Sequence, residues 1–422
     1  MTKTRVLIGT HSHPAVTKGG AEIAAWRLFE GVGEQPEWDT WFIGCAREAG
    51  GRLGANITQP FGDREFLYAP NSFDWFKFSN QDPTFPAELE AMLQDIRPQI
   101  LHFHHYVNFG LETFMHVKRI LPDSRIVLTL HEFQAICNHY GQMVTRQKKS
   151  LCYESSLRDC NACFPEFSRA DFFLRKTYIE RFFALVDQFT APSHFLAERY
   201  IRWGVAPERM TVIENVTAPV SSPVDTPVES NPAIFRVGFF GQISFLKGIN
   251  VLLEAAHLLD EAEIDEVQFD IHGDYRGQPP EFQEDFLARM EKAGNNVRFH
   301  GPYENQRVDQ LMRAVDIVLI PSIWWENSPV VIQECFRNRV PVLCSNIGGM
   351  AEKIRPGIDG FQFPVGSATD LAALLKTLAA DRPRVAAIVQ TMRYPAAAQD
   401  IIDQHLALYA RALAEPPAPA FV

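Results

Sequence analysis

The sequence predicts an α/β protein made of two doubly wound units, each a parallel sheet with helices on both faces. Three observations support this prediction. Short apolar runs alternate with stretches of helical periodicity, the same alternation starts again near residue 235, and a segment rich in Pro, Ser and Val separates the two series. A chain of 422 residues with 46% hydrophobic residues is long enough to bury two such cores.

The first series defines a predicted Rossmann-like domain at residues 1–216. The apolar run from Arg5 to Thr10 leads into a loop of Gly, His, Ser and Pro, and helical spacing of apolar residues follows from Ala21 to Phe29. Further strands of this domain are predicted at 40–44, 100–103, 125–130, 188–193 and 210–213. The segment 217–233 lacks an apolar period and is predicted to be a linker.

The second series defines a predicted domain at residues 234–396. Its strands are predicted at 235–240, 267–273, 297–299, 317–320 and 340–343. Residues 397–422 comprise an amphipathic helix from Ala398 to Leu413 and a Pro-rich tail. Two such units joined by a linker are expected to face each other across a cleft. Ligands of open parallel sheets bind beyond the carboxyl ends of the strands, so the loops after the strands should line that cleft.

Charge and composition narrow the class of protein. Lys and Arg total 40 against 51 Asp and Glu, a formal charge of −11, which disfavours general binding to nucleic acid phosphates. No apolar run reaches the ~18 residues needed to cross a bilayer. The start from Met1 to Arg5 leads into a strand without a signal-peptide pattern, so we expect a cytoplasmic protein.

The most informative segment is Trp325–Glu334, which places two carboxylates around a predicted helix start. Ser328 is a good N-cap and Pro329 a good first helical residue, and the free N–H groups of such a helix favour an anion. Glu326 precedes the helix and Glu334 lies in it, on the order of 8 Å further along the axis. Carboxylates on both sides of a bound phosphate suit a sugar nucleotide. The alternative is an amphipathic helix with surface glutamates.

This segment resembles family-4 retaining glycosyltransferases of the GT-B fold, whose hallmark is a pair of glutamates at this spacing. The likeness extends through 340–352 and 357–361. It implies that Glu326 and the turn after it, Asn327, Ser328, Pro329 and Val330, meet the donor, and that Glu334 meets the nucleotide ribose. It also implies that domain 1–216 is the acceptor side, that domain 234–396 binds the nucleotide sugar, and that the helix of 397–422 returns to the first domain.

A glycine loop follows the first strand of the second domain. It runs from Gly241 to Gly248, where backbone N–H groups can approach a phosphate and Lys247 supplies a charge for the diphosphate. The alternative is a turn with a solvated lysine. The resembled family often has an arginine where this chain has Gln242, so Lys247 acts with less help or Arg276 compensates.

Two positions of the first domain are donor-side candidates by the same resemblance. Gly20 ends the first loop, at a helix start, and is assigned a diphosphate contact; a loop that needs glycine only for positive φ is equally compatible. His131 follows the strand 125–130 at its carboxyl end, where the family has a histidine that touches the transferred sugar. A hydrogen-bonded structural histidine is the alternative.

Two clusters suggest metal ligands. His102, His104 and His105 cannot all converge, because alternation along a strand puts His105 on the opposite face, so a metal there is disfavoured. Four of the seven cysteines fall within 27 residues, in an irregular insert at 137–167: Cys137, Cys152, Cys160 and Cys163. In a cytosolic chain this clustering favours a structural zinc site, with disulfides or free thiols as alternatives. Cys45, Cys335 and Cys344 are predicted core residues.

The stretch from Phe172 to Phe183 is apolar on one face and basic on another. It could rest on the inner face of a membrane, but a buried helix of the first domain is the favoured interpretation.

The predicted function is transfer of a sugar from a nucleotide-diphosphate donor to a saccharide or lipid-linked hydroxyl acceptor, with retention and without a catalytic metal. The catalytic candidates are Glu326, His131 and Lys247, and the resemblance makes surface polysaccharide or glycan assembly the expected context. The alternatives are a phosphorylase or sugar-phosphate synthase on the same fold, a non-catalytic nucleotide-sugar sensor, and an interaction module built on the cysteine insert. The sequence does not determine the oligomeric state.

Overall fold

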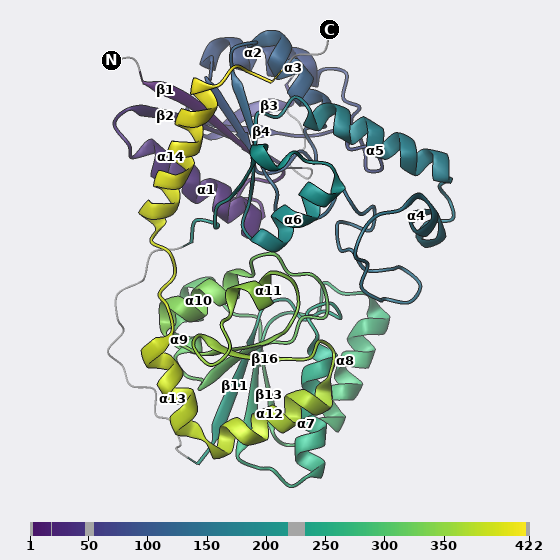
Figure 1. Cartoon of the computed structure of the whole chain (residues 1–422), viewed down its shortest axis with the longest axis vertical. Helices are drawn as coiled ribbons and strands as arrows, with labels where there is room; N and C mark the ends of the chain where they lie inside the picture. Colours follow the sequence, from purple (N-terminus) through teal and green to yellow (C-terminus); the bar gives the residue numbers. More distant parts are fainter. Residues whose placement is uncertain (1–2, 18, 47–54, 218–232, 419–422) are drawn as a thin grey trace. The chain divides into compact units, whose positions relative to one another are not determined.

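A computed structural model describes residues 3–17, 19–46, 55–217 and 233–418, which form two compact units (Figure 1). Unit 1 comprises residues 1–218 and 396–422, and unit 2 comprises residues 219–395. The predicted linker at 217–233 lies outside the described residues except for its two ends. No helix among the described residues is long and apolar enough to span a bilayer.

Unit 1 contains an eight-stranded sheet in the order β10-β9-β8-β7-β1-β2-β4-β3. Its strands are β1 (Thr4–Thr10), β2 (Trp38–Cys45), β3 (Ile57–Gly62), β4 (Glu65–Tyr68), β7 (Ile100–Phe103), β8 (Arg125–Thr129), β9 (Gln188–Ala191) and β10 (Met210–Val212). Apart from β3 they are parallel, and the order outward from β1 changes direction between β1 and β7. This reversal is the topological switch point of a Rossmann-like sheet.

Unit 1 contains seven α-helices within its described residues. They are α1 (Gly20–Gly33), α2 (Phe85–Ile96), α3 (Glu112–Ile120), α4 (Leu157–Cys163), α5 (Arg169–Phe183), α6 (His194–Trp203) and α14 (Ala398–Ala414), with a 3-10 turn at Pro207–Arg209. Capping side chains define the amino-terminal ends of several of these helices. Ser193 caps α6 by accepting from the Leu196 N–H at 3.2 Å, and Ser168 and Asp171 form a capping box at α5.

Unit 2 has a six-stranded parallel sheet in the order β13-β12-β11-β14-β15-β16, which reverses between β11 and β14. Its strands are β11 (Phe235–Phe240), β12 (Val267–His272), β13 (Val297–Gly301), β14 (Ile317–Ile320), β15 (Val342–Ser345) and β16 (Gly360–Phe363). The 3-2-1-4-5-6 order is that of a dinucleotide-binding sheet.

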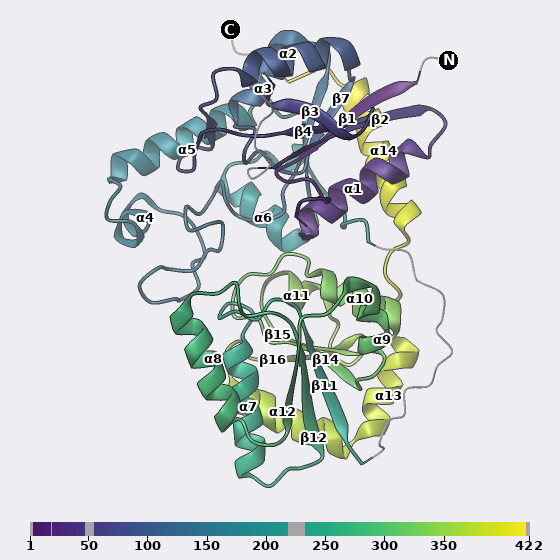
Figure 2. The same ribbon diagram turned by 180° about the vertical axis from the view of Figure 1, so that it is seen from behind.

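Helices cover both faces of the unit 2 sheet. Figures 1 and 2 show α7 and α8 on one side of the strands and α9, α10 and α13 on the other. The helices are α7 (Ile249–Glu261), α8 (Pro280–Lys292), α9 (Val308–Met312), α10 (Val330–Asn338), α11 (Gly348–Lys353), α12 (Ala368–Ala380) and α13 (Arg382–Thr391), with a 3-10 turn at Asn305–Arg307. Apart from the edge strand β13, the parallel strands are buried along most of their length, as expected for a sheet covered on both faces.

The sequence analysis missed the hairpins of unit 1. Strand β3 runs antiparallel to β4, because the Asp63 and Arg64 turn between them is too short for a crossover. Two short strands, β5 (Phe73–Asp74) and β6 (Ser79–Asn80), form a second antiparallel pair outside the main sheet. The cysteine insert follows β8, and its helix α4 lies beyond the amino-terminal end of α5 (Figures 1 and 2).

The C-terminal helix α14 belongs to the core of unit 1. Ile401, Ile402, Leu408 and Tyr409 are buried in one cluster with residues of β1 and α1. A side chain at Gly31 of α1 would lie 2.1 Å from Ile402, so the absence of one lets α1 and α14 pack closely.

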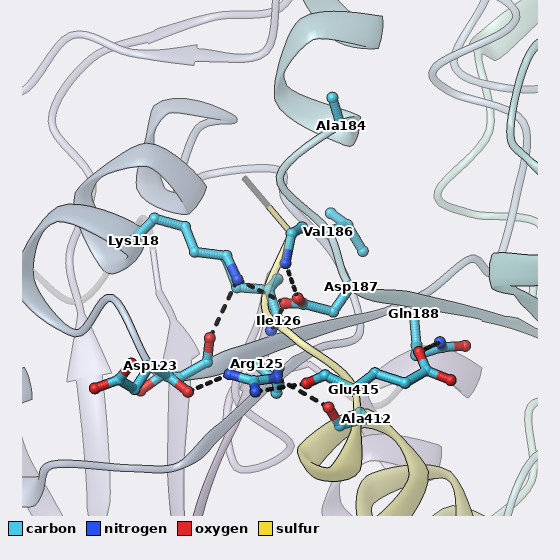
Figure 3. A network of polar contacts seen from close by, with 12 residues as sticks. Lys118, Asp123, Arg125, Ile126, Ala184, Val186, Asp187, Gln188, Ala412 and Glu415 are labelled. Atoms are coloured by element: carbon cyan, nitrogen blue, oxygen red, sulfur yellow. Dashed lines mark hydrogen bonds and ion pairs between the residues drawn. The ribbon is translucent and has the colours of Figure 1, made fainter. Parts of the chain in front are cut away.

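A buried polar network holds the end of this helix (Figure 3). Arg125 donates to the carbonyl oxygens of Ala412 at 2.9 Å and Glu415 at 2.7 Å. Beside it, Lys118 donates to Asp187 at 2.8 Å, and the same carboxylate accepts from the Ala418 N–H at 2.6 Å. The network joins α3, β8 and β9 to the residues that follow α14.

The Lys118→Met variant tests how much this network contributes to the stability of the fold. It leaves the buried Asp187 carboxylate without its cation, and breaking a buried pair costs about 3–5 kcal/mol. We expect the urea midpoint to fall accordingly. Lys176→Met removes an exposed ion pair with Glu180 and should change stability by less than about 1 kcal/mol. Equal midpoints for the two variants would contradict the assignment.

Candidate functional site

The switch point of unit 2 carries the lysine and the first glutamate of the predicted donor site. Lys247 lies in the loop between β11 and α7, and Glu326 lies in the loop between β14 and α10. These two strands are neighbours at the place where the strand order reverses, which is where open α/β sheets bind ligands. Two side chains 79 residues apart therefore meet at one edge of the sheet.

Glu326 is held by three donors. Its Oε1 accepts from Lys247 Nζ at 2.5 Å, Ser322 Oγ at 2.9 Å and Trp324 Nε1 at 2.9 Å. The residue is 6% exposed, whereas the Lys247 side chain is one-third exposed and lies over the Trp324 ring. The lysine is thus anchored at the carboxylate and keeps part of its charge open to solvent.

Two glycines let the loops of this edge come together. A Cβ at Gly248 would lie 1.8 Å from the Pro321 carbonyl oxygen, and one at Gly349 would lie 1.7 Å from the Asn327 carbonyl oxygen. Both are backbone contacts that a side chain could not relieve. In addition, the Gly349 N–H donates to the Glu326 carbonyl oxygen at 2.7 Å. The glycines therefore set the position of the backbone that carries Glu326.

The predicted helix start is wrong by one residue. Helix α10 begins at Val330, and its N-cap is Pro329, with ψ 123° and no side-chain cap hydrogen bond, in place of Ser328. With this extended ψ, Pro329 still belongs to the loop, so the helical backbone starts at the next residue. Asn327 is buried and Val330 is exposed. The first turn of α10 begins four residues after Glu326, at the end of the same loop after β14.

Glu334 lies inside α10 and is 8% exposed. Burial raises its pKa above the ordinary range, while Arg337 acts in the opposite direction. Its neighbourhood includes Tyr303, whose own pKa is raised first by burial and then by the charge of Glu334. The two glutamates therefore lie in different environments. Glu326 is paired with the Lys247 cation, whereas Glu334 is buried near the phenol group of Tyr303.

The glycine loop places Gly241 at the end of β11 with φ 133°, and a Cβ there would meet nothing within 4 Å. Its own N–H is already bonded to the His272 carbonyl oxygen at 3.1 Å. Gln242, where the resembled family often has arginine, is exposed. Arg276, the residue considered as a substitute, is exposed and paired with Asp274 at 2.6 Å. Lys247 is the cation that this loop brings to Glu326.

The carboxyl edge of the unit 1 sheet gathers histidines. Gly20 is the first residue of α1, and Glu22 in its first turn is buried and lies 3.2 Å from His11 Nε2, after β1. His131, after β8, lies 3.0 Å from His104 Nδ1, after β7. The structure thus places Gly20, at the start of α1, and His131 at the same edge, with His11 and His104 directly after β1 and β7, the strands that flank the switch point.

Sequence reasoning missed three members of this edge: His11, Glu22 and Glu132. His105 Nε2 lies 3.2 Å from the Glu132 carboxylate, and the rings of His11 and His105 are 4.5 Å apart. Each of these residues lies one to three positions after a strand end or in a first helical turn. That position was the available signal, because strand ends of a doubly wound sheet meet at one edge.

Burial keeps these histidines neutral. It lowers the pKa of His11 to about 4 and those of His105 and His131 to about 3. The pKa of His102 and of His104 is also lowered well below the usual value by burial. By contrast, burial raises the pKa of Glu132 to about 8. At neutral pH the edge therefore offers imidazoles as hydrogen-bonding groups.

The described residues contain no group of three or more His, Cys, Asp or Glu side chains arranged to hold a metal ion. His102 lies 2.7 Å from the Tyr409 hydroxyl and 2.6 Å from the Thr129 hydroxyl, which accounts for both ring nitrogens. The four cysteines of the insert are half-buried. Cys45, Cys335 and Cys344 are buried core residues.

The Phe-rich stretch forms helix α5. Phe172, Ile179, Phe182 and Phe183 are buried against unit 1, whereas Phe173 and Leu174 are exposed.

Solved structures with the same fold include glycosyltransferases of the GT-B class. The structure of HepE from Anabaena in complex with UDP and glucose aligns over 97% of this chain and 98% of that chain, with a TM-score of 0.63 and 18% identity. Sucrose-phosphate synthase from Thermosynechococcus elongatus aligns over 98% and 99%, with a TM-score of 0.67 and 17% identity. At these identities the similarity establishes the fold, which is GT-B.

Sequence family models identify the family of the chain in addition to its fold. The model described as Glycosyltransferase Family 4 matches residues 19–217, and the model described as Glycosyl transferases group 1 matches residues 229–393. Between them they cover both units, and the chain belongs to the family-4-type glycosyltransferases.

Curated relatives match only part of the chain. D-inositol 3-phosphate glycosyltransferase 1 of Catenulispora acidiphila is 26% identical over 248 residues, which cover 54% of this chain and 58% of that protein. The enzyme of the same name from Nocardia farcinica is 31% identical over 153 residues, 35% of this chain and 34% of that protein. The chain thus matches from about a third to somewhat over half of the length of these relatives.

The buried histidines predict a loss of stability in mild acid. Their folded pKa values lie below the ordinary 6.5, so below pH 6.5 the unfolded chain binds protons that the folded chain does not. Each contributes a loss of up to about 1.4 kcal/mol per pH unit as the pH falls toward 4. Glu132 acts oppositely, because its raised pKa gives stability below about pH 4.5 that is lost as the pH rises toward 8.

Two variants separate these contributions between pH 6.5 and 4.5. His131→Gln should flatten the dependence of the unfolding free energy on pH, and Glu132→Gln should steepen it. Urea denaturation at several pH values measures both slopes. Unchanged slopes in both variants would contradict the assigned pKa values.

Proposed function

We propose that the chain transfers a sugar from a nucleoside-diphosphate sugar to a hydroxyl acceptor, with retention at the anomeric carbon. The observation that carries this proposal is the Lys247–Glu326 pair at the switch point of unit 2, directly before the first turn of α10. A cation, a helix amino terminus and a carboxylate at one edge suit a ligand that joins a diphosphate to hydroxyl groups.

Each donor-side residue has a proposed part. The α10 N–H groups, together with the turn Asn327, Ser328, Pro329 and Val330, bind the diphosphate with Lys247. Glu326 orients sugar hydroxyls, and Glu334 binds the ribose. Gly241 and Gly20 let backbone approach the donor, and His131 contacts the transferred sugar. The half-exposed cation and the buried carboxylates support these roles.

The chemistry follows from these groups. The bond from the anomeric carbon to the diphosphate oxygen breaks, the bond to the acceptor oxygen forms on the same face, and the acceptor proton passes to the departing phosphate. Negative charge develops on the diphosphate, and preorganised N–H donors and Lys247 stabilise it in place. Because these groups supply the positive charge, we propose chemistry that does not depend on a metal ion.

The acceptor is proposed to be a saccharide or a lipid-linked saccharide in surface polysaccharide assembly. A structure with the same fold is described as a lipopolysaccharide outer core galactosyltransferase, and the curated relatives act on D-inositol 3-phosphate by name, which makes inositol phosphates the second acceptor class to assay. The exposed Phe173 and Leu174 on α5 support a peripheral location at the inner face of a membrane.

The cysteine insert is proposed to hold a structural zinc ion through Cys137, Cys152, Cys160 and Cys163. Support comes from their half-burial within one insert and from the Arg146 N–H, which donates to the Cys163 sulfur at 3.3 Å. Such N–H donors stabilise thiolates. Metal analysis of the purified full chain tests this: about one zinc per chain supports it, and none contradicts it.

The Glu326→Gln variant tests the catalytic proposal. Gln keeps an acceptor for Ser322 and Trp324 but removes the negative charge, so we expect a folded protein whose turnover falls at least about 100-fold. Donor hydrolysis without acceptor, measured alongside, separates an enzyme from a sensor that only binds. Glu291→Gln on the exposed side of α8 is the matched control. Unchanged turnover in Glu326→Gln would exclude the residue from the site.

The Lys247→Ala variant tests donor binding. It removes the cation that faces the diphosphate, and we expect donor affinity to fall about 10–100-fold, which corresponds to roughly 1.4–2.8 kcal/mol. A thermal-shift screen of the wild-type chain against UDP-, GDP- and ADP-sugars first identifies the donor. Calorimetry then compares the variant with the wild type, and equal affinities would reject the phosphate role of Lys247.

A further inference from the structure

Unit 1 contains a cavity that the donor site does not use. It has a volume of about 340 Å³ and lies between the residues of the β5–β6 hairpin and the cysteine insert. We call it the aromatic cavity, because six aromatic rings and a set of polar side chains line it: Trp75, Phe76, Phe78, Tyr140, Phe164 and Phe167, with Gln134, Asn138, His139, Arg146 and Glu166. Its size falls in the range of small-ligand pockets.

The rim of the aromatic cavity leaves large aromatic surfaces in water. Trp75 is 44% exposed and Tyr140 is 74% exposed. Phe76 and Phe167, in contrast, are stacked on each other with centroids 4.0 Å apart and form part of the wall. Exposed aromatic faces beside a packed wall are typical of a binding site and cost free energy in a surface without a ligand.

The backbone around the aromatic cavity is strained. Phe78, Tyr140 and Met143 have φ values of 57°, 49° and 49°, in the left-handed region that side chains other than glycine rarely adopt. Gly141 between them has φ 68°, and a Cβ there would lie 2.8 Å from the Gln134 backbone nitrogen. Such conformations persist where the surrounding structure holds them, and they are concentrated at binding sites.

Arg175 supplies the support beneath the cavity. It is 3% exposed and donates to the carbonyl oxygens of Phe76 at 2.8 Å, Ala135 at 2.8 Å and Gln134 at 2.6 Å. One buried guanidinium therefore ties the β5–β6 hairpin to the segment just before the insert. The cavity is built from two segments about 60 residues apart in the sequence that this residue holds together.

The polar groups of the aromatic cavity show which chemistry it would bind. Arg146 donates to Glu166 at 2.7 Å and lies over the Phe164 ring, so both members of the pair line the cavity. The side-chain oxygen of Gln134 is buried and has no hydrogen-bond partner among the described residues. A buried acceptor without a partner favours a ligand that supplies an O–H or N–H donor.

We propose that the aromatic cavity binds a pyranose ring of the acceptor glycan. A sugar offers C–H faces to Trp75 and Tyr140 and hydroxyl groups to Gln134 and to the Arg146–Glu166 pair. An acyl or prenyl chain would leave these polar groups against hydrocarbon, which is unfavourable. The inference rests on the proposed function, since it assigns to an acceptor a site that a sugar transferase would use.

The chain connects this cavity to the histidine edge of unit 1. Segment 131–140 begins with His131 and Glu132 at the end of β8, and it supplies Gln134, Asn138, His139 and Tyr140 to the cavity. A glycan whose reactive end lies at the histidine edge can therefore place a further sugar in the aromatic cavity. The cavity would then select among acceptors without touching the reacting atoms.

Glycan binding by the full chain tests this proposal. The wild-type protein is applied to an array of neutral and amino-sugar oligosaccharides, and the affinity for the best-bound glycan is measured by calorimetry. Trp75→Ala and Tyr140→Ala should each weaken binding about tenfold. Phe173→Ala, which removes an exposed aromatic side chain of α5 outside the cavity, is the matched control and should leave the affinity unchanged.

Gln134→Leu separates binding from a structural role. It removes the unpartnered buried oxygen, so the melting temperature should be unchanged or higher while glycan affinity falls about tenfold. Absence of any bound glycan, glycan binding equal to wild type in all three cavity variants, or displacement of the glycan by a dodecyl chain that lacks a sugar would overturn the proposal. Donor thermal shifts and donor hydrolysis should persist in every variant, so their loss would count against the proposed function instead.

Discussion

The carboxyl edge of the unit 2 sheet depends on one partly buried contact, the ion pair between Lys247 and Glu326 at 2.5 Å. The two residues come from loops that end β11 and β14, and the glycines at 248 and 349 remove the side chains that would keep those loops and the following helix apart. A buried carboxylate without a cation is unfavourable, so the pair fixes both loops. The first turn of α10 opens beside it as a consequence.

The sequence predicted the fold class and the family because their signals are local. Apolar runs of strand length, glycines at loop ends and the glutamate pair at 326 and 334 are all readable without tertiary information, and the fold class and family are confirmed. The start of α10 at Val330 was missed by one residue. Its position depends on the ψ of Pro329, which the neighbouring loops set and the residue types alone do not.

Long-range packing explains what sequence reasoning missed in unit 1. The pairs His11–Glu22 and His105–Glu132 join positions that are 11 and 27 residues apart, and each residue by itself is an ordinary polar side chain. The aromatic cavity is similar, since Trp75 and Tyr140 are 65 residues apart in the sequence and line it together, while Arg175 joins Phe76 to Ala135. Sequence motifs identify the residues at the edge of unit 2 that carries Lys247 and Glu326. At the polar edge of unit 1, tertiary contacts determine which residues meet.

A crystal structure of the full chain with its nucleoside diphosphate bound would test the central claim most directly. The account predicts phosphate oxygens within hydrogen-bonding distance of Lys247 Nζ and of the first N–H groups of α10, with the ribose hydroxyls at Glu334. A diphosphate bound elsewhere, or an α10 amino terminus closed by other protein groups in that complex, would contradict it.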